Sequence, residues 1–389
     1  MSTIKVNGIR GVGASTDAIS VNNTDGTCTA KITTTYGNKN VLYNGEMNIH
    51  QRGTTTTSGS DAYMSCDRWK TNNGTGCQFT VSKDTDVPTG EGFGTSTKWD
   101  VTTADASPAS GNWMRICQRL EGNDCQRFRK GTSNATKFAF QFWIKTTVTG
   151  TYIAELFDTD NNRQISKAYT VSSANTWEKK ELIFDADTTG ALTADNNISF
   201  EVILWLATGT DFSSGTLNTS WASNTNANRA VGQVNAVHNT ANNIYLTGLQ
   251  LEASDYCSDF EFLPYGVEEE RCKRYFHRLV GGASDYWLQA AKYTNDTSIG
   301  IIHWSPWMRD IPTLSFNTGT NYHTFYSDSD ESGANVSGSG WSIQQASKKS
   351  AGLRYLLTGS ESGMSFAGSG DGIFWFSSSS ATVDLNAEL

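Results

Sequence analysis

The sequence has few charged residues, few prolines and few histidines. Charged residues make up 18% of the chain, and there are 5 Pro and 5 His among 389 residues, whereas an average globular protein carries about 25% charged residues. Glycine (36 residues) and aromatic residues (11%) are plentiful instead. Turn formers combined with aromatic residues are typical of many short strands, and disordered chains lack the aromatic residues. The composition predicts an all-β protein, whose length suits two or three domains.

Long apolar runs and basic clusters are also missing. The longest purely apolar run covers residues 202–207, far short of the roughly 20 residues of a membrane-spanning helix. Residues 1–10 contain no apolar stretch of the kind that secretion signals carry. The net charge is −9, and proteins that bind phosphates need clustered Lys and Arg. We therefore expect no membrane insertion, no nucleic-acid partner and synthesis in a reducing cytoplasm.

The cysteines and histidines show no metal-binding spacing. No two cysteines form a Cys-x-x-Cys pair and the histidines are dispersed, so no metal site is predicted. Burial as small hydrophobic side chains is the expected role of the cysteines, with a disulfide between Cys117 and Cys125 left open. The seven cysteines are at positions 28, 66, 77, 117, 125, 257 and 272, and the five histidines at positions 50, 238, 277, 303 and 323.

No catalytic motif is complete. Residues 359–363 (Gly-Ser-Glu-Ser-Gly) match part of the nucleophile elbow of serine hydrolases, but no strand-to-helix context surrounds them. Asp328, Asp330 and Glu331 lie in a Ser/Gly-rich stretch that is typical of a solvated turn. The sequence therefore predicts a protein that is not an enzyme.

One segment imitates the start of a calcium-binding loop. Asp158, Asp160 and Asn162 alternate as the first ligands of such a loop do, but Arg163 replaces the required glycine and Tyr169 replaces the bidentate glutamate. Because the segment separates two strand-like runs, we predict a hairpin turn there.

Alternating patterns predict a β-sandwich through the middle of the chain. Apolar residues occupy every second position in 138–144 and 198–206, as in half-buried strands. The runs 152–157 and 165–171 predict a hairpin, and 177–184 predicts another strand. Short strands separated by polar turns are typical of a sandwich.

Smaller units flank this region. Asp25-Gly26 between β-prone runs predicts an N-terminal hairpin. A helix is predicted over 267–277, where glutamates precede basic residues by four positions, and Tyr275 and Phe276 would anchor it as a rigid joint. A C-terminal β unit is predicted from strand-like runs at 299–304, 313–316, 373–376 and 382–389.

Two groups of residues, about 200 positions apart, are more informative than the rest. The first is an Asn-Gly-Glu-Met segment followed by Asp-Arg-Trp; the second is a Gln-Leu-Glu strand, a Pro-Tyr-Gly turn and an Arg-Tyr-Phe helix. Together they resemble the motifs that open and close a jelly-roll module in structural proteins of tailed bacteriophages, and the strands between them are similar to carbohydrate-binding-module-like jelly rolls. The residues that carry the resemblance, expected to be structural, are Asn44, Gly45, Arg52, Asp67, Arg68, Trp69, Gln250, Glu252, Pro264, Tyr265, Arg274 and Tyr275.

The resemblance implies four parts and a place on a virion. The parts are an N-terminal attachment segment (1–36), a jelly-roll sandwich (37–263), a linker helix (264–279) and a C-terminal β-sandwich-like domain (280–389). The implied protein is a non-enzymatic tail fibre or other appendage subunit, assembled in the host cytoplasm, with other virion proteins as partners and a homotrimer as oligomer. A capsid decoration or head-fibre protein, and a sugar-binding module without a virion role, are the alternatives.

The resemblance also raises the question of a structural calcium, because carbohydrate-binding jelly rolls often carry one. Glu46 or Asp67 would then contribute ligands, although the residues themselves predict no cofactor and no metal. Arg52, Asp67 and Arg68 are explained equally well by a buried pair that fixes a loop.

Aromatic side chains on strands are the candidate ligand-binding residues. Rings stack on the C–H faces of sugars while polar side chains bond the hydroxyls. Trp143, Trp205 and Tyr152 are predicted to contact host surface polysaccharide in this way, although tryptophan in a sandwich is more often a core residue, and exposed aromatic strips also serve subunit contacts. The last domain offers four alternatives, Trp287, Trp304, Trp307 and Trp341.

Overall fold

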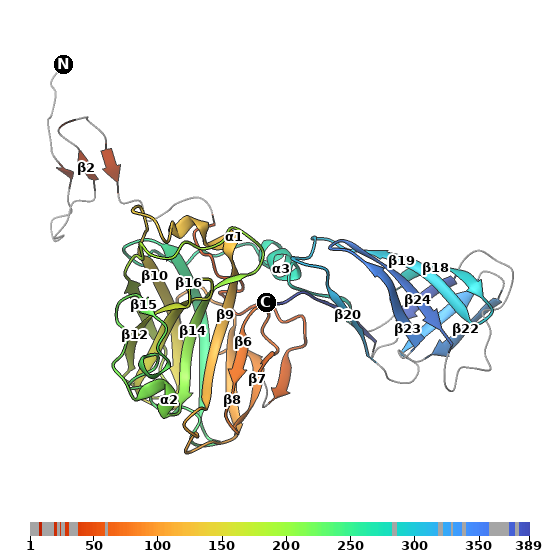
Figure 1. The fold of residues 1–389 in the computed structure, drawn as a ribbon. Helices are drawn as coiled ribbons and strands as arrows, with labels where there is room; N and C mark the ends of the chain where they lie inside the picture. The colour runs from red at the N-terminus through yellow and green to blue at the C-terminus, as the bar shows by residue number, and fades with distance from the viewer. Residues whose placement is uncertain are drawn as a thin grey trace.

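A computed structural model shows an all-β protein with one short helix between two β domains (Figure 1). It describes residues 8–9, 19–21, 24, 28–30 and 38–389, apart from 59–60, 282–285, 318–321, 328–329, 337–339, 358–372 and 378–380. The partial nucleophile-elbow match at 359–363 lies outside the described residues. None of the helices in the described part is long and apolar enough to cross a membrane.

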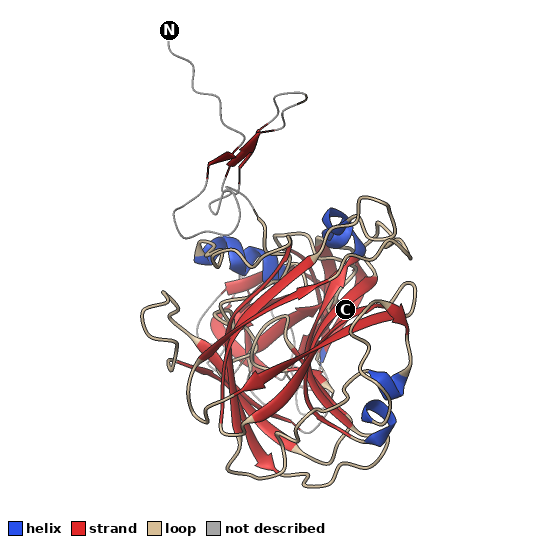
Figure 2. Cartoon of the chain, turned by 90° about the vertical axis from the view of Figure 1, so that its left-hand side faces the viewer, coloured by secondary structure: helices blue, strands red, loops and turns tan. Residues whose placement is uncertain are grey.

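The larger domain is a sandwich of two antiparallel sheets, with its short helices outside the strand layers (Figure 2). In spatial order, the six-stranded sheet contains β13 (Glu178–Phe184), β10 (Phe138–Thr146), β16 (Asn243–Ala253), β8 (Ser96–Thr103), β7 (Gln78–Asp84) and β4 (Thr55–Ser58). The seven-stranded sheet contains β15 (Ala222–Ser223), β12 (Arg163–Val171), β11 (Gly150–Asp158), β14 (Ile198–Thr208), β9 (Trp113–Glu121), β6 (Lys70–Asn73) and β5 (Ala62–Tyr63). The helical turns are α1 (Gly122–Cys125), η1 (Gln126–Phe128), α2 (Thr210–Ser213) and η2 (Asn226–Asn228).

The core lies between the two sheets and follows the predicted alternation. Phe138, Phe140 and Phe142 of β10 face inward, as do Phe200 and Val202 of β14, and all five are buried in one apolar cluster. The predicted hairpin is also present, because β11 and β12 pair from Gly150↔Val171 to Asp158↔Arg163. The segment that imitates a calcium loop is therefore a hairpin turn, as predicted.

The described N-terminal strands form a small separate sheet. β2 (Ile19–Val21) pairs with β3 (Cys28–Ala30), and β1 (Gly8–Ile9) adds to the other edge of β2. The predicted hairpin is thus part of a three-stranded sheet.

The C-terminal domain also contains two sheets. One consists of β17 (Phe276–Gly281), β26 (Thr382–Asn386) and β20 (Thr313–Phe316). The other, in spatial order, consists of β22 (Asp330–Val336), β21 (His323–Ser327), β25 (Ile373–Ser377), β18 (Tyr286–Thr294), β19 (Thr297–His303), β24 (Ser350–Leu356) and β23 (Trp341–Ala346). A separate apolar cluster, which includes Leu353, Tyr355 and Trp375, forms its core.

The helix that joins the domains, α3 (Tyr265–Lys273), is shorter than the predicted 267–277 at its C-terminal end. Phe276 already belongs to β17, where it pairs with Asn386 of β26. Tyr275, between helix and strand, is fully buried. The helix itself is confirmed, but its predicted C-terminal end was wrong, because the local charge pattern favours helix whereas the residues from 276 onward pair with the distant strand β26.

The last three residues return to the sandwich, so that the C-terminal residue lies beside it (Figure 1). The predicted strand over 382–389 ends at Asn386, after which the Ala387 N–H donates to the Tyr275 carbonyl at 2.8 Å. The Leu389 carbonyl accepts bonds from the Tyr63 hydroxyl at 2.9 Å and from Arg119 at 3.1 Å. Residues 387–389 therefore tie the C-terminal domain to β5 and β9 of the sandwich.

Candidate functional site

Around Trp205, the outer face of the seven-stranded sheet is covered by the chain itself. Trp205 points to this side and is fully buried, packed with Ile153 and Ile203 against Phe212 and Leu217 of the loop that follows β14. Its indole N–H donates to the Glu155 carboxylate at 2.8 Å. Trp205 therefore has no ring face that a sugar could reach.

Tyr152 is also a core residue. Its ring is fully buried between the sheets and stacks on Tyr169, with 5.7 Å between centroids. The hydroxyl donates to the Val148 carbonyl at 2.8 Å. Burial removes Tyr152, like Trp205, from the residues that can meet a ligand from solution.

Trp143 is the predicted stacking residue that remains at the surface. It lies on β10 with the opposite phase to Phe140 and Phe142, so its half-buried side chain faces outward from the six-stranded sheet. The residues opposite it are Lys179 on β13 and Thr247 on β16.

The strand β16 bends beside Trp143. Gly248 has φ +66°, and the register of β10 with β16 shifts between Gln141 and Trp143, as at a β-bulge. A Cβ at this position would come within 2.6 Å of the Phe93 ring and 3.0 Å of the Trp143 ring. The glycine thus allows the two rings to approach the backbone from the outer side of the sheet.

Two positions further along β10, a row of polar and aromatic side chains crosses the same outer face. Lys145, Tyr245 and Lys98 stand directly opposite one another on β10, β16 and β8. The Lys145 and Lys98 ammonium groups are 4.9 Å and 5.7 Å from the centroid of the Tyr245 ring. Tyr245 therefore lies between two lysines that come from the strands on either side.

Trp177, just before β13, completes the row. Its ring meets Tyr245 edge to face, with 6.2 Å between centroids. Its indole N–H donates to Asp86 at 2.9 Å, and Asp86 also pairs with Lys145. The Lys145 ammonium, mainly through its hydrogen bond, lowers the pKa of Asp86, so this carboxylate is ionised and accepts bonds at neutral pH.

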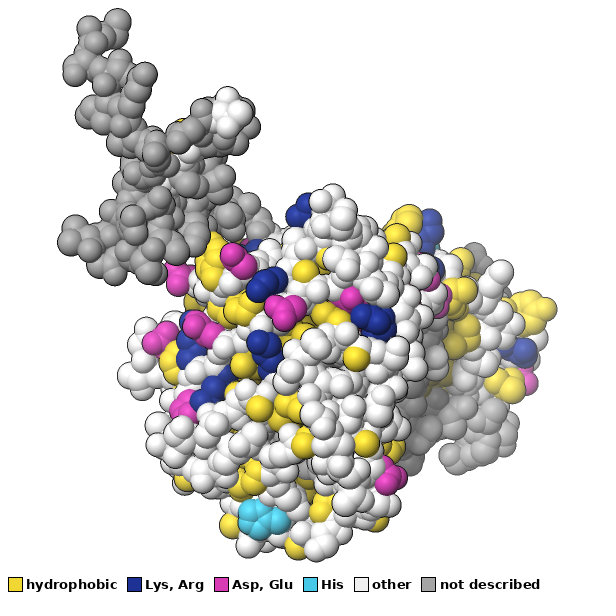
Figure 3. All heavy atoms as spheres, turned by 60° about the vertical axis from the view of Figure 1, so that its left-hand side comes forward, with side chains coloured by type: hydrophobic (Ala, Val, Ile, Leu, Met, Phe, Trp, Pro, Cys, Tyr) yellow, Lys and Arg dark blue, Asp and Glu magenta, His cyan; other side chains and the backbone are white. Residues whose placement is uncertain are grey.

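The outer face therefore combines two half-buried indoles, Trp143 and Trp177, with ammonium, carboxylate and phenol groups that hold one another in place. Such a surface offers apolar ring area together with fixed donors and acceptors, the combination that orients a small polar ligand. We call Trp143, Trp177, Tyr245, Lys145, Lys98 and Asp86 the ring face. In the view of Figure 3, Lys and Arg side chains lie next to Asp and Glu, without a continuous basic patch.

The sequence prediction missed Trp177 and Tyr245. Tyr245 alternates with the inward-facing Ile244 and Leu246, and that phase already indicates an outward ring. Trp177 opens the predicted strand 177–184, but its neighbours Asp86 and Tyr245 come from distant segments, so the local pattern does not mark it as a surface ring. In the last domain, Trp304 is buried, Trp287 and Trp341 pack on each other at 4.9 Å, and Trp307 is 64% exposed.

The residues that carry the phage resemblance form a second cluster, at the joint between the domains. The two motifs meet there, because the Leu249 N–H donates to the Gly45 carbonyl at 2.9 Å and the Asn44 N–H donates to the Glu268 carboxylate of α3. A Cβ on Gly45 would lie 2.3 Å from the Leu249 carbonyl oxygen, so only glycine fits this approach. Asn44 bonds four backbone groups of residues 48, 49 and 67, and Trp69 donates to its carbonyl at 3.1 Å.

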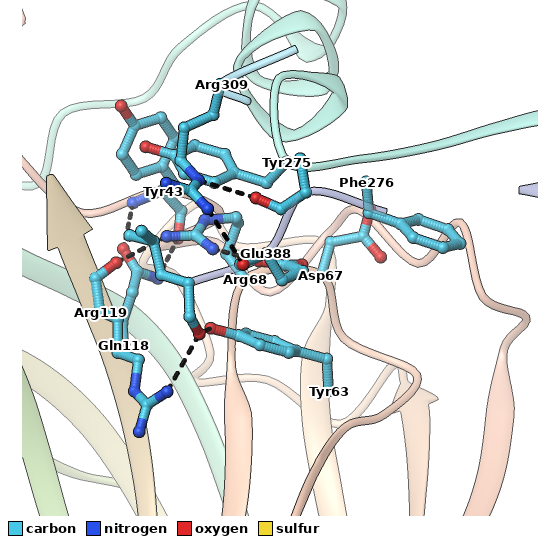
Figure 4. A network of polar contacts seen from close by, with 12 residues as sticks. Tyr43, Tyr63, Asp67, Arg68, Gln118, Arg119, Tyr275, Phe276, Arg309 and Glu388 are labelled. Carbon is cyan, nitrogen blue, oxygen red and sulfur yellow. Dashed lines mark hydrogen bonds and ion pairs between the residues drawn. The ribbon is translucent and has the colours of Figure 1, made fainter. Parts of the chain in front are cut away.

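Arg68 is the centre of this cluster (Figure 4). Its guanidinium is fully buried, lies 3.5 Å from the centroid of the Tyr275 ring and donates to the Arg119 carbonyl at 2.6 Å. Its carboxylate partner is Glu388, which comes from the last residues of the chain and also pairs with Arg52 at 3.1 Å. A buried arginine of the sandwich is thus neutralised by the C-terminal domain.

Neighbouring residues extend the cluster. Asp67 pairs with Arg52 at 3.4 Å, and Arg274 donates to both oxygens of Glu121 at 2.9 Å and 2.8 Å. Gln250 and Glu252 instead bind the segment 258–261. The Glu252 carboxylate accepts bonds from the Ser258 N–H and hydroxyl, and the Gln250 side-chain oxygen accepts one from the Glu261 N–H. Pro264 precedes α3, and Tyr265 is 54% exposed.

A structural calcium does not fit the ligands that were suggested for it. Asp67 accepts a bond from the Gln51 amide at 2.6 Å and pairs with Arg52, and burial raises its pKa to about 7, so it has no free negative charge to offer a cation. Burial raises the pKa of Glu46 to about 6. Within the described residues, no group of three or more His, Cys, Asp and Glu side chains could hold a metal ion, and the cysteines at positions 66, 77, 117, 125, 257 and 272 are free thiols.

Comparison with known proteins gives distant likenesses. No protein-family model matches the sequence, and no curated protein is significantly similar to it.

Among solved structures, the enzymatically active domain of tailspike protein 4 from bacteriophage CBA120 is 16% identical, over 55% of this chain and 21% of that chain, with a TM-score of 0.29. The carbohydrate-binding module TmCBM61, solved with β-1,4-galactotriose, is 9% identical over 55% of this chain and 99% of that chain (TM-score 0.28). The family 11 carbohydrate-binding module of Clostridium thermocellum Lic26A-Cel5E is 11% identical over 51% and 95% (TM-score 0.26). TM-scores this low assign the chain neither a ligand nor an activity.

Proposed function

We propose that this chain is a non-enzymatic structural subunit of a phage tail fibre or similar appendage, whose sandwich contacts saccharides of the host envelope through the ring face. The observation that carries the sugar-binding part is the outward position of Trp143 on β10, together with Trp177 beside the interlocked Lys145, Asp86 and Tyr245. The virion part is supported by the sequence motifs of residues 43–69 and 244–276.

The ring face suits a neutral or weakly charged sugar. Each pyranose ring has an apolar C–H face and a rim of hydroxyls, and each hydroxyl is both donor and acceptor. The indoles supply apolar area, while two ammonium donors and one carboxylate acceptor stand beside them. A phosphate backbone would instead need several unpaired cations, whereas Lys145 and Lys98 both have carboxylate partners.

Affinity electrophoresis with host envelope polysaccharide tests the sugar-binding part. The purified chain should be retarded in gels that contain the polysaccharide, and Trp143→Ala and Trp177→Ala should each weaken binding about five- to thirtyfold, since one lost ring contact is worth roughly 1–2 kcal/mol. Trp307→Ala is the matched control, because this indole is exposed on the other domain. Retardation that survives both ring-face substitutions, or no retardation with any envelope fraction, would contradict the proposal.

Immunogold labelling of intact particles with antibodies to residues 37–263 tests the virion part. Gold on the tail or its fibres is the expected result. Gold over the head would assign the chain to capsid decoration instead. Unlabelled particles combined with intact sugar binding would leave a sugar-binding module without a virion role.

A further inference from the structure

Away from the ring face, a lysine side chain is buried inside a cage of oxygen atoms. Lys130, just after η1, is fully buried, and its ammonium pairs with Asp158 at the end of β11 and, at 2.9 Å, with Asp187 in the loop after β13. The same ammonium donates to the carbonyls of Thr189 at 3.0 Å and Gly190 at 2.9 Å. Oxygen ligands from four residues in two separate segments, the end of β11 and the loop after β13, thus converge on one positive charge.

The cage is held in place without the lysine. The Asn161 N–H and its side-chain amide both donate to Asp158, at 2.9 Å and 3.1 Å. Arg163 binds both oxygens of Asp187, at 2.8 Å and 3.0 Å, and the Thr189 N–H donates to Asp187 at 3.0 Å. The carboxylates and carbonyls are therefore oriented by their own partners, as the ligands of a metal site usually are.

The charge of the cage requires a cation. Asp158 and Asp187 carry two negative charges, and among the residues named here Arg163 offsets one of them. The Asp158 carboxylate has 0% side-chain exposure and that of Asp187 4%, so solvent cannot neutralise the second charge. An uncompensated buried charge is strongly destabilising.

Two carboxylates and two adjacent carbonyls are the ligand types of a hard cation such as Ca²⁺, which accepts irregular shells of 6–8 oxygens and shares them with water. We propose that the Lys130 ammonium takes the place of a metal ion in this cage, and that the chain without this ammonium binds one Ca²⁺ there instead. The fold then needs no metal ion.

The proposal concerns the hairpin end of the sandwich and does not depend on sugar binding. Its test is the thermal stability of the full-length chain with EDTA or with millimolar Ca²⁺ at equal ionic strength. The wild-type Tm should be the same in both. Lys130→Ala should melt lower than wild type in EDTA and rise by roughly 5–10 °C in excess Ca²⁺, with a stoichiometry of one ion per chain by calorimetry.

Lys130→Met is the matched control. Its side chain fills the same space without a charge, so it should be destabilised and should not respond to Ca²⁺. Equal Ca²⁺ responses of the Ala and Met variants, or a comparable response of the wild type, would overturn the proposal. If Lys130→Ala does not fold during expression, recovery on refolding with Ca²⁺ but not with EDTA supports the proposal, and recovery in neither contradicts it.

Discussion

At the scale of single residues, the most unusual feature is the amount of charge buried at the joint. Arg68 and Asp67 are adjacent in sequence and both almost completely buried, yet their partners come from different parts of the chain: Glu388 for Arg68, and Gln51 and Arg52 for Asp67. Arg68 also has φ +69°, an uncommon conformation for a non-glycine residue. Such a conformation persists only where the surroundings fix it, and here the Tyr275 ring and Glu388 do so.

Asp67 gives a prediction about pH. Burial raises its pKa from 3.8 to about 7, although Arg52 and Gln51 act in the opposite direction. Because the folded state holds the proton more tightly, the stability that Asp67 contributes is fully present below about pH 4 and is lost as pH rises through 7. From pH 5 to pH 8, wild type should therefore lose roughly 1–3 kcal/mol of unfolding free energy relative to Asp67→Asn.

Urea denaturation of both proteins at the two pH values measures this difference. His50, whose pKa burial lowers to about 4, acts in the opposite direction, but the Asn variant retains it and so cancels its effect. The same pH dependence in wild type and Asp67→Asn would show that Asp67 is already ionised at pH 5.

At the scale of elements, the alternation of apolar residues predicted where the strands lie, but it did not predict which outward side chains are covered by other segments. The alternation of 138–144 and 198–206 placed Phe140 and Val202 correctly in the core. The same alternation puts Trp205 on the outer face of β14, which would be exposed in an isolated sheet. The segment directly after β14, with Phe212 in α2, folds back and covers it, and the alternation within the strand does not indicate that return.

The joint between the domains also shows how far the local sequence pattern can predict contacts. Glu268 to Arg274 has the charge pattern of a helix, and α3 forms there, with Glu269 and Lys273 paired at 3.3 Å. Arg274 instead binds Glu121 of β9. The motifs that contain Asn44 and Gln250 could be recognised in the sequence, but the role of Glu388 could not, because nothing local links it to Arg68 320 positions away.

The bulge in β16 yields an element-scale prediction. Gly248→Ala forces an alanine into left-handed φ and brings its Cβ to 2.6 Å from the Phe93 ring. The cost should be roughly 2–4 kcal/mol of unfolding free energy, and the displaced Trp143 ring should weaken sugar binding. Gly94→Ala is the matched control, since a Cβ there meets nothing within 4 Å. Equal urea midpoints for the two variants would refute the role given to this glycine.

At the scale of the whole molecule, the chain consists of two β domains whose joint is fixed by residues 387–389. Arg309 strengthens it by donating to the Ala387 carbonyl at 2.8 Å and to the Asn196 carbonyl of the sandwich at 2.7 Å.

This joint predicts that a substitution in the C-terminal domain destabilises the sandwich. Glu388→Ala leaves the buried Arg68 without its carboxylate, which should cost the sandwich about 3–5 kcal/mol. Asp384→Ala, on the same terminal segment, removes a pair with Arg278 that is partly exposed, at 2.7 Å, and should cost about 1 kcal/mol or less. Differential scanning calorimetry should show the sandwich transition lowered by the first substitution and unchanged by the second. A shift confined to the C-terminal domain would contradict the joint described here.

The central claim is that the sandwich binds saccharide through the ring face. The most direct measurement is a titration of the 12 tryptophan indole N–H signals by NMR with host envelope oligosaccharide, each signal assigned by a Trp→Phe variant. The account predicts shifts of the Trp143 and Trp177 signals, while those of the buried Trp69, Trp99 and Trp205 stay in place. Shifts only among the tryptophans of the C-terminal domain, or no shifts at all, would contradict it.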